Sequence, residues 1–377
     1  MSNVEATPKT ISEYHEFYLQ RLYALINAYG SLGASDVHIL PDDGIYTVTD
    51  GVLMRDQSPH AIVGHAEIAE WLRQPGQLGQ ATEEVLEQFG HVTLAFDTGR
   101  YRTRGSFRRT SHGVSATFRI IPRVVPDADA VGVPQVVQEL AKKSAGLILI
   151  AGPTGSGKTT AIAALVNQLN MNSDRHFYLI EDPIEFVHAP FGNSVFTQRE
   201  IGVHAADFSS AIENALRSKP NVIVVGELLN VAASRAALQA ATTGHLVIST
   251  AHAGSVAEAI ENFIGQFATG EQSLIRSRLS QSLLAILVQK LVPAVGGGLV
   301  AAREVMINSR NFQELIRDPT KINMVNQQLQ SSAGCTTLED SLLSLVRTGR
   351  ITPSVATEQA MNTEAVVDGL LRMEKNR

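Results

Sequence analysis

The sequence predicts an α+β domain at the N-terminus, followed by an α/β domain of the P-loop type that ends in a mainly helical C-terminal region. Three observations support this order: a long amphipathic helix with short strands before residue 122, a proline-rich stretch at 123–135, and alternating apolar runs and helical segments after it. The chain of 377 residues is long enough for two or three domains, each with its own core.

The N-terminal segment, residues 1–122, combines helical and strand periodicity. Residues 12–29 place Tyr18, Leu22 and Ile26 on one helical face. Short apolar runs separated by Asp-Gly turns then predict antiparallel strands around a second helix. The expected strands cover 37–40, 45–49, 52–54, 92–96, 100–107 and 114–121, and the second helix covers 66–72.

Prolines mark the transition to the second domain. Pro126 and Pro134 indicate a linker over residues 123–135. The segment 136–293 then alternates compact apolar runs with helical patterns, which is typical of parallel strands buried between helices, and residues 294–377 are expected to be mainly helical. The expected strands cover 147–151, 177–180, 222–225 and 246–250, and the expected helices cover 159–169, 207–217, 231–241, 256–264 and 276–291.

Composition favours a protein of the reducing cytoplasm. The chain has one cysteine, Cys335, so it cannot build a disulfide framework, and residues 1–11 lack the apolar segment of a signal peptide. No apolar run is long enough to span a membrane, so we expect any membrane contact to go through a partner. The formal net charge of −6 argues against a general nucleic-acid-binding surface, which would have to neutralise phosphates.

The strongest motif follows the first expected strand of the second domain. Residues 152–159 match G-x-x-x-x-G-K-[ST] in full, between an apolar strand and a helical run. In that context backbone N–H groups at a helix N-terminus bind phosphates, the lysine adds positive charge, and the threonine hydroxyl ligates Mg²⁺. We therefore expect ATP and Mg²⁺ as ligands, with Thr159 as a metal ligand. The expected nucleotide-binding residues are Gly152, Pro153, Thr154, Gly155, Ser156, Gly157, Lys158, Thr159 and Thr160.

Two carboxylates follow the next apolar strand. Glu181 and Glu185 lie where the carboxyl end of a parallel strand would place them at the ligand-binding edge of the sheet. Hydrolysis needs a carboxylate that orients or deprotonates the attacking water, so both are catalytic candidates. The alternative is a role in a turn or a helix cap, which is common for acidic residues after a strand.

A third acidic residue ends the strand at 222–225. The run that leads through Gly226 into Glu227 resembles a Walker B element. Glu227 is expected to hold the metal through water or to polarise the nucleophile, and the alternative is a strand that simply ends in a polar residue.

Two histidines bracket the strand at 246–250. Seven residues separate His245 from His252, so they lie at opposite strand ends, which argues against a shared zinc site. One of them is expected to sense the γ-phosphate, and the alternative is a hydrogen-bonded structural histidine.

These four segments, in this order, resemble the Walker A, Asp box, Walker B and His box of the PilT- and PilU-like secretion ATPases of the GspE/PulE superfamily. Further segments that resemble this family extend along nearly the whole chain. They are residues 33–38 (G-A-S-D-x-H), 99–102 (G-R-F-R), 118–122 (F-R-x-I-P), 197–200 (N-Q-R-E), 216–220 (L-R-x-x-P) and 302–307 (A-x-E-I-M-I).

The resemblance implies a PAS-like N-terminal domain and a RecA-like P-loop ATPase domain, assembled as a homohexamer. It also implies that Arg102 and Arg119 act as arginine fingers on a nucleotide phosphate, with Arg109 as a candidate third finger. Arginine suits this role because its planar guanidinium matches phosphate oxygens. By composition alone, the arginine cluster at residues 100–123 would instead be a solvated strand face.

Two segments depart from the family pattern. The family reads G-E-[hydrophobic]-R-D after the Walker B strand, whereas this chain has Leu229 and Asn230 at the last two positions. Loss of that ion pair predicts weaker hydrolysis or weaker coupling to motion. The A-I-R-x-L-I-R segment of retraction motors is matched only in its second half, at residues 311–317, which favours the TraJ and DotB group of conjugation and type IVB secretion.

We therefore expect a hexameric ATPase motor that hydrolyses MgATP to drive a type IV secretion, conjugation or type IV pilus machine. The expected partners are copies of itself and an inner-membrane platform protein, without nucleic acid. The expected location is the cytoplasm, peripherally at the inner membrane through those partners. Two alternatives stay open: a nucleic-acid translocase on a RecA-like ring, and a nucleotide-binding scaffold with weak turnover.

Overall fold

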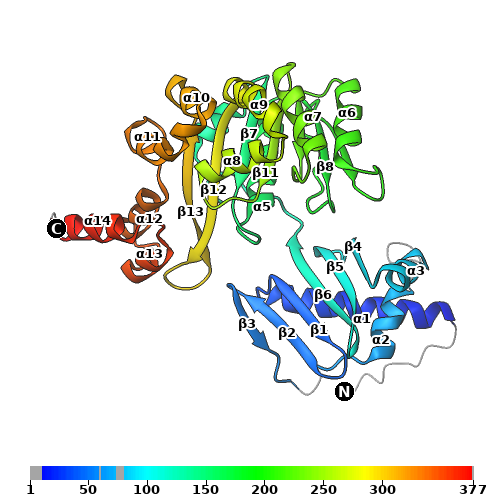
Figure 1. Ribbon diagram of the computed structural model, residues 1–377. Coiled ribbons are helices and arrows are strands. Elements are labelled where there is room, and N and C mark those ends of the chain that lie inside the picture. Colours follow the sequence, from blue (N-terminus) through cyan, green and yellow to red (C-terminus); the bar gives the residue numbers. More distant parts are fainter. Residues whose placement is uncertain (1–10, 59–60, 74–79, 376–377) are drawn as a thin grey trace. The chain divides into compact units, whose positions relative to one another are not determined.

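The computed structural model describes residues 11–58, 61–73 and 80–375. The chain divides into two compact units, Met1–Val124 and Val125–Arg377, and the division falls inside the expected linker. Figure 1 shows the elements of both units, each of which is described by itself. The first ten residues, to which the signal-peptide expectation applies, lie outside the described residues.

The first unit is built on a six-stranded antiparallel sheet in the order β3-β2-β1-β6-β5-β4. Every strand predicted for this segment is confirmed. The strands are β1 (Asp36–Leu40), β2 (Gly44–Thr49), β3 (Val52–Arg55), β4 (His91–Asp97), β5 (Tyr101–Thr110) and β6 (Gly113–Pro122).

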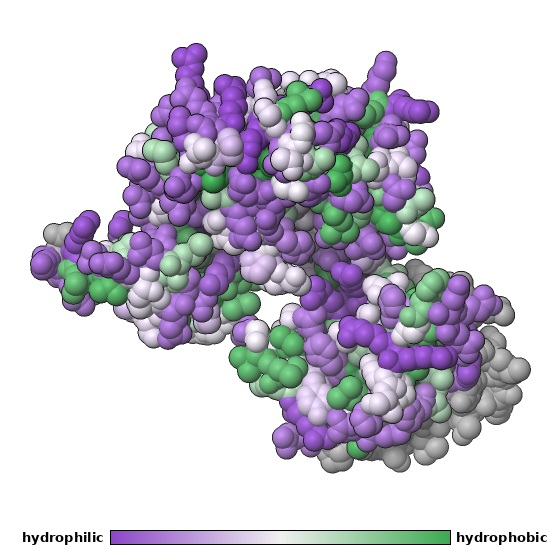
Figure 2. Space-filling view, in the orientation of Figure 1, coloured by the Kyte–Doolittle hydropathy of each residue, from purple (hydrophilic) through white to green (hydrophobic). Residues whose placement is uncertain are grey.

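Three helices pack with this sheet: α1 (Ile11–Ser31), α2 (His65–Leu72) and α3 (Gln80–Phe89). The core between helices and sheet contains Ile26 of α1, Trp71 of α2 and Phe118 of β6, all fully buried. The first two helices were predicted, whereas α3, which is rich in glutamate and glutamine, was not. The edge strand β3 is exposed throughout, and Figure 2 shows hydrophobic surface at its position.

The second unit contains a seven-stranded sheet in the order β13-β12-β7-β11-β10-β8-β9. All neighbouring strands are parallel except β12 and β13, which form an antiparallel pair. The strands are β7 (Gly146–Ala151), β8 (His176–Glu181), β9 (Val195–Glu200), β10 (Val222–Val225), β11 (Leu246–Ala251), β12 (Leu283–Pro293) and β13 (Leu299–Ile307).

Helices cover both faces of this sheet. Alternate residues of β7 face opposite sides: Ile148 and Ile150 belong to a core with α4 (Gln135–Leu140) and α5 (Lys158–Asn172), whereas Leu147 and Leu149 belong to the other core. Burial on both faces explains why these strands are continuous apolar runs in the sequence. The helices of the second core include α6 (Phe208–Arg217), α7 (Val231–Thr242), α8 (Val256–Gly265) and α9 (Thr269–Ser282).

The predicted helix at 276–291 is wrong in its second half. The helix α9 ends at Ser282, and Leu283–Pro293 is strand β12, which pairs with β7 on one side and β13 on the other. A short continuous apolar run fits a buried strand as well as a buried helix, so periodicity could not separate the two. Pairing with β7 and β13 decides the conformation.

The C-terminal region is helical after β13. The expected boundary at residue 293 cuts the β12–β13 hairpin, so the helical region begins after Ile307. Its elements are α10 (Arg310–Arg317), the 3₁₀-helix η1 (Pro319–Met324), α11 (Val325–Ser331), α12 (Leu338–Arg347), α13 (Pro353–Gln359) and α14 (Thr363–Lys375). Across the described residues, no helix has the length and apolar character that a membrane crossing requires.

Candidate active site

Four predicted motifs meet at one edge of the seven-stranded sheet. The strands β7, β11, β10 and β8 are adjacent and parallel, so their carboxyl ends lie side by side. The P-loop follows β7, Glu181 ends β8, Glu227 follows β10, and His252 follows β11. Ligands bind at this edge in open α/β sheets.

Two P-loop glycines are required by close packing as well as by backbone angle. Gly152 has φ +148°, and a Cβ there would lie 2.3 Å from the Gln289 carbonyl oxygen. Gly157 has φ +81°, and a Cβ there would lie 2.9 Å from Gln289 Nε2. Gly157 is also the N-cap of α5, so the backbone N–H groups of the loop lie next to those of the helix N-terminus.

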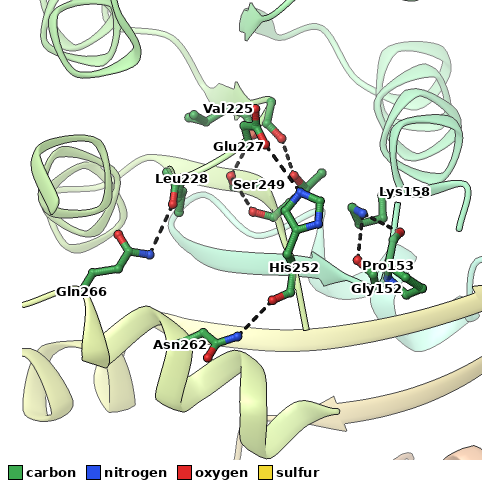
Figure 3. Close-up of polar contacts among 12 residues, drawn as sticks. Gly152, Pro153, Lys158, Val225, Glu227, Leu228, Ser249, His252, Asn262 and Gln266 are labelled. Atoms are coloured by element: carbon green, nitrogen blue, oxygen red, sulfur yellow. Dashed lines mark hydrogen bonds and ion pairs between the residues drawn. The ribbon is translucent and has the colours of Figure 1, made fainter. Parts of the chain in front are cut away.

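Lys158 begins α5 and lies against the P-loop backbone. Its Nζ donates to the carbonyl oxygens of Gly152 at 2.8 Å and Pro153 at 2.9 Å (Figure 3). Burial lowers the pKa of Lys158, and the carboxylate of Glu227 opposes part of that shift. The first turn of α5 carries no acidic residue, so the ammonium and the helix N-terminus together favour an anion.

Glu227 and His252 form a polar pair across neighbouring strand ends. Their Oε2 and Nε2 atoms lie 3.6 Å apart, and both side chains are partly exposed (Figure 3). The Asn262 amide donates to the His252 carbonyl oxygen at 3.0 Å and holds the loop after β11. His252 is therefore the predicted histidine that reaches the phosphate-binding edge.

Hydroxyl groups of β11 fix the end of β10, just before Glu227. Ser249 Oγ donates to the Val225 carbonyl oxygen at 2.8 Å, and Thr250 Oγ1 donates to the Gly226 carbonyl oxygen at 2.5 Å. Both hydroxyl-bearing side chains are buried. Because these carbonyls are bound, the direction in which the chain leaves β10 is set by β11.

The acidic loop after β8 is held by β9. Gln198 Nε2 donates to Glu181 Oε2 at 3.1 Å, and the side chain of Glu181 is buried. Glu200 Oε2 accepts from the backbone N–H of Ile184 at 3.0 Å. The half-buried Glu185 follows directly in this loop, so two polar residues of β9 position the segment that carries both catalytic candidates.

His245 lies outside this edge. It precedes β11, and its carbonyl oxygen accepts from the N–H of Gly146 at the start of β7, at 3.1 Å. Strands of this length place it about 20 Å from His252. The structure therefore leaves His252 as the histidine of the site.

Arg102 and Arg119 lie in the first unit, on the sheet face opposite its core. Arg119 follows the buried Phe118, and its Nε donates to Asp36 Oδ1 at 2.9 Å. Arg104 lies directly opposite Arg119 in the β5–β6 register. The sheet therefore presents several guanidinium groups on one face, and one of them already has a carboxylate partner.

Arg109 lies on the other face of the same sheet. Its register partner, Val114, packs against the helix-covered core, and its guanidinium lies 3.8 Å from Glu87 of α3. A side chain on this face cannot contact the same anion as Arg102 or Arg119, which lie on the opposite face. The structure separates the candidate third finger from the other two.

The two family departures after β10 have local explanations. Leu229 is exposed, at 61% of its accessible surface. Asn230 is the N-cap of α7, and its side chain accepts from the Ala233 N–H at 2.9 Å. Asparagine is as good an N-cap as aspartate, so this position keeps its helix-starting role without the negative charge.

A nucleotide with Mg²⁺ fits the donor set at this edge. Thr159, in the first turn of α5, and Glu227 supply oxygen atoms. Within the described ranges, no group of three or more His, Cys, Asp or Glu side chains could hold a metal ion by itself. Mg²⁺ keeps several waters and binds through one or two protein oxygens together with substrate phosphates.

Sequence reasoning missed three residues that shape the site. Gln198 and Glu200 lie in the segment that resembles N-Q-R-E, so a signal was present without an assigned role. Gln289 carried no signal, because its segment was interpreted as a helix. Its position beside the P-loop follows from β12 being a strand next to β7.

Comparisons with known proteins agree with this geometry. Residues 15–337 match the family model described as type II/IV secretion system protein. A twitching motility protein of Neisseria gonorrhoeae is 40% identical over 287 residues, which cover 75% of this chain and 76% of the relative. The type IV pilus retraction ATPase PilT of Pseudomonas aeruginosa is 36% identical over 333 residues, which cover 87% and 94%.

Two solved structures have a fold similar to that of this chain. The pilus retraction motor PilT with bound ADP superposes with a TM-score of 0.79 at 32% identity, covering 91% of this chain and 98% of that one. The ATPase DotB of Legionella pneumophila superposes with a TM-score of 0.73 at 26% identity, covering 89% and 94%. The match covers most of the chain, and the chain belongs to the type II/IV secretion system protein family.

Proposed function

We propose that this protein is a hexameric motor that hydrolyses MgATP to drive a pilus or secretion machine. As a member of its family it is an ATPase motor of this class of machines. The observation that carries the proposal is the meeting of Lys158, Glu227 and His252 at one sheet edge, beside a complete P-loop.

Each residue at the edge has a proposed role in phosphoryl transfer. The P-loop N–H groups and Lys158 bind the β- and γ-phosphates, and the Thr159 hydroxyl ligates Mg²⁺, with Glu227 reaching the metal through water. Mg²⁺ supplies charge neutralisation on the phosphates when bound. Glu185 orients the attacking water for in-line displacement, and Glu181 supports it from the end of β8. His252 contacts the γ-phosphate side and links it to Glu227.

The first unit is proposed to complete the site of another copy. In this proposal the unit is a PAS-like domain, the second unit is RecA-like, and Arg102 and Arg119 stabilise the transferring phosphate of a neighbouring subunit. Arginine supplied from outside the nucleotide-binding unit has this effect in other nucleotide hydrolases. Arg109 is left out of this role, because it pairs with Glu87 on the other sheet face.

The proposed surroundings follow the family. The motor works in the cytoplasm, at the inner membrane, through a platform protein of the machine. Among the solved structures, the pilus retraction motor PilT is 32% identical to this chain, whereas DotB of Legionella pneumophila is 26% identical. Identity therefore supports the pilus class more strongly than the type IVB class expected from residues 311–317.

One hydrolysis experiment separates this function from its two rivals. The full chain is assayed for steady-state and single-turnover ATP hydrolysis, with and without DNA. A motor of this class gives repeated turnover that DNA leaves unchanged. Strong stimulation by DNA would identify a translocase, and nucleotide binding without repeated turnover would identify a scaffold.

A further inference from the structure

A buried glutamine of β12 contacts the P-loop from behind. Gln289 is 3% exposed, and its Nε2 donates to the Ser156 carbonyl oxygen at 2.5 Å. The same residue packs so closely on Gly152 and Gly157 that neither position has room for a Cβ. Gln289 therefore lies against the loop at Gly152, Ser156 and Gly157.

The hydrogen bond to Ser156 determines the direction of an N–H group. In a planar trans peptide, the carbonyl of one residue and the N–H of the next point in opposite directions. The amide of Gln289 holds the Ser156 carbonyl towards β12, so the N–H of Gly157 is turned away from β12, into the loop. Gly157 is the N-cap of α5, where backbone N–H groups are needed to bind phosphate.

An arginine of β13 fixes the amide of Gln289 in this orientation. Arg303 is the register partner of Gln289, and its Nε donates to Gln289 Oε1 at 2.9 Å. Because that oxygen is bound, the amide nitrogen has to face Ser156. An amide rotated by half a turn would set its NH₂ group against the Arg303 donor.

Arg303 itself is tied to the segment that follows the unit boundary. Its guanidinium donates to the Val131 carbonyl oxygen, and its backbone N–H donates to Ser341 Oγ of α12 at 2.9 Å. Arg303 is 8% exposed, and its guanidinium donates to oxygen atoms of Gln289 and Val131, neither of which is a carboxylate. Burial lowers the pKa of Arg303 to about 10, which still leaves it charged near neutral pH.

We propose that Gln289 is a positioning residue for nucleotide binding, and that Arg303 sets its orientation. The chain of contacts runs from Val131 through Arg303 and Gln289 to the Ser156–Gly157 peptide of the P-loop. The buried guanidinium also adds a positive charge behind the loop, and this favours an anion there. The inference rests on the P-loop being the nucleotide site of this protein.

The experiment measures ADP binding to the full chain by titration calorimetry. Gln289→Met keeps the length of the side chain but removes its donor, so the Ser156–Gly157 peptide is free to turn. We expect the Kd for ADP to rise about tenfold, because one phosphate-binding N–H loses its direction. With ATP, KM should rise by a similar factor while kcat changes less, because the reacting groups are unaltered.

Two further variants test the role of Arg303. Arg303→Met should weaken ADP binding in the same direction, and Arg303→Lys should restore part of it, because lysine keeps the charge and one donor. The double variant Gln289→Met with Arg303→Met should bind ADP no more weakly than Gln289→Met alone, because both residues act on one peptide. Additive losses would contradict the chain of contacts.

Arg175→Met is the matched control. Arg175 is also a partly buried arginine that donates to backbone carbonyls, those of Ala141 and Lys142. It should leave ADP affinity within twofold of wild type. If Gln289→Met does not fold, Gln289→Asn takes its place, since the shorter amide cannot span the same gap.

The outcomes separate this inference from the proposed function. ADP binding within twofold of wild type by a folded Gln289 variant would overturn the inference alone. If the wild-type chain bound no nucleotide, or if Lys158→Ala bound it normally, the proposed function would fail together with the inference.

Discussion

Two charged regions of the molecule position their side chains in different ways. One is the P-loop edge of the second unit, and the other is the arginine face of the first unit, the sheet face that carries Arg102, Arg104 and Arg119. At the P-loop edge, each functional side chain follows the end of a different strand, so parallel pairing alone brings them together. On the arginine face, the side chains lie within β5 and β6, so strict alternation decides which of them share a face. Motifs therefore bring together the residues of the first region, whereas in the second region the strand register decides which arginines share a face.

The two regions also differ in how their charges are satisfied. Lys158 is buried and donates only to loop carbonyls, and its pKa is lowered by burial. Arg119 is half-exposed and already paired with Asp36. The second unit thus has a preorganised anion site of its own, whereas the first unit would have to exchange a surface ion pair for a phosphate contact.

The largest expected effect is at the P-loop lysine. Lys158→Ala removes the ammonium that lies inside the loop, so ATP hydrolysis should fall to background. Phosphate release and nucleotide binding are measured on a variant shown to be folded by circular dichroism. Near-normal turnover by this folded variant would remove the P-loop from the mechanism.

The next effect tests which carboxylate orients the water. Glu185→Gln should bind ATP normally and lose about 10²–10⁴-fold in kcat, because general-base assistance is lost while the phosphate cradle is intact. Glu227→Gln is the matched comparison, and it should also weaken the dependence on Mg²⁺. Hydrolysis by Glu185→Gln within a few-fold of wild type would move the role to Glu227.

A smaller effect should distinguish the two faces of the N-terminal sheet. Arg102→Ala should lower kcat, because this arginine lies on the face proposed to reach a phosphate. Arg109→Ala should change kcat by less than twofold, because it loses only a surface pair with Glu87, worth about 0–1 kcal/mol. Equal losses for both variants would mean that the sheet acts only through its fold.

The smallest expected effect concerns the pH dependence of stability. The pKa of Glu304 is raised to about 7, mainly by burial and less by the charge of Glu339, against the lowering effect of the Val256 N–H. The folded state therefore holds this proton more tightly than the unfolded state, and stability should fall as pH rises from about 4.5 to about 7.

Glu304→Gln keeps an acceptor for the Val256 N–H but cannot ionise, so it isolates this contribution. The difference in Tm between wild type and variant should change steadily across that pH range. Burial lowers the pKa of His188 to about 4, so this residue makes stability rise with pH. That trend is the same in both proteins and cancels when their Tm values are subtracted. A constant difference in Tm would show that Glu304 stays ionised in the fold.

How much of this the sequence could predict depends on where each residue lies relative to a strand end. The placing of the P-loop, Glu181, Glu227 and His252 at one sheet edge could be predicted, because each lies at the end of an apolar run that is buried on both sides. His245 was also a candidate, but it lies at the other end of the same strand as His252. Only the carboxyl ends of the strands form the ligand-binding edge.

The remaining features depend on tertiary pairing. The apolar run beginning at Leu283 fits a helix or a strand locally, and it becomes β12 because β7 and β13 supply partners. The contacts of Gln289 and Arg303 follow only from that pairing. Likewise, the face occupied by Arg109 follows from the pairing of β5 with β6, because a shift of one residue would have placed it on the face that carries Arg119.

Catalysis shared between subunits is tested most directly by mixing two inactive variants. One chain carries Arg102→Ala with Arg119→Ala and keeps its P-loop, and the other carries Lys158→Ala and keeps its arginines. Each should be inactive alone, and mixed rings verified by mass measurement should recover hydrolysis, because an intact P-loop then lies beside a neighbour's intact arginines. No recovery in verified mixed rings would contradict this, and would mean that the arginines act within their own chain or only in its fold.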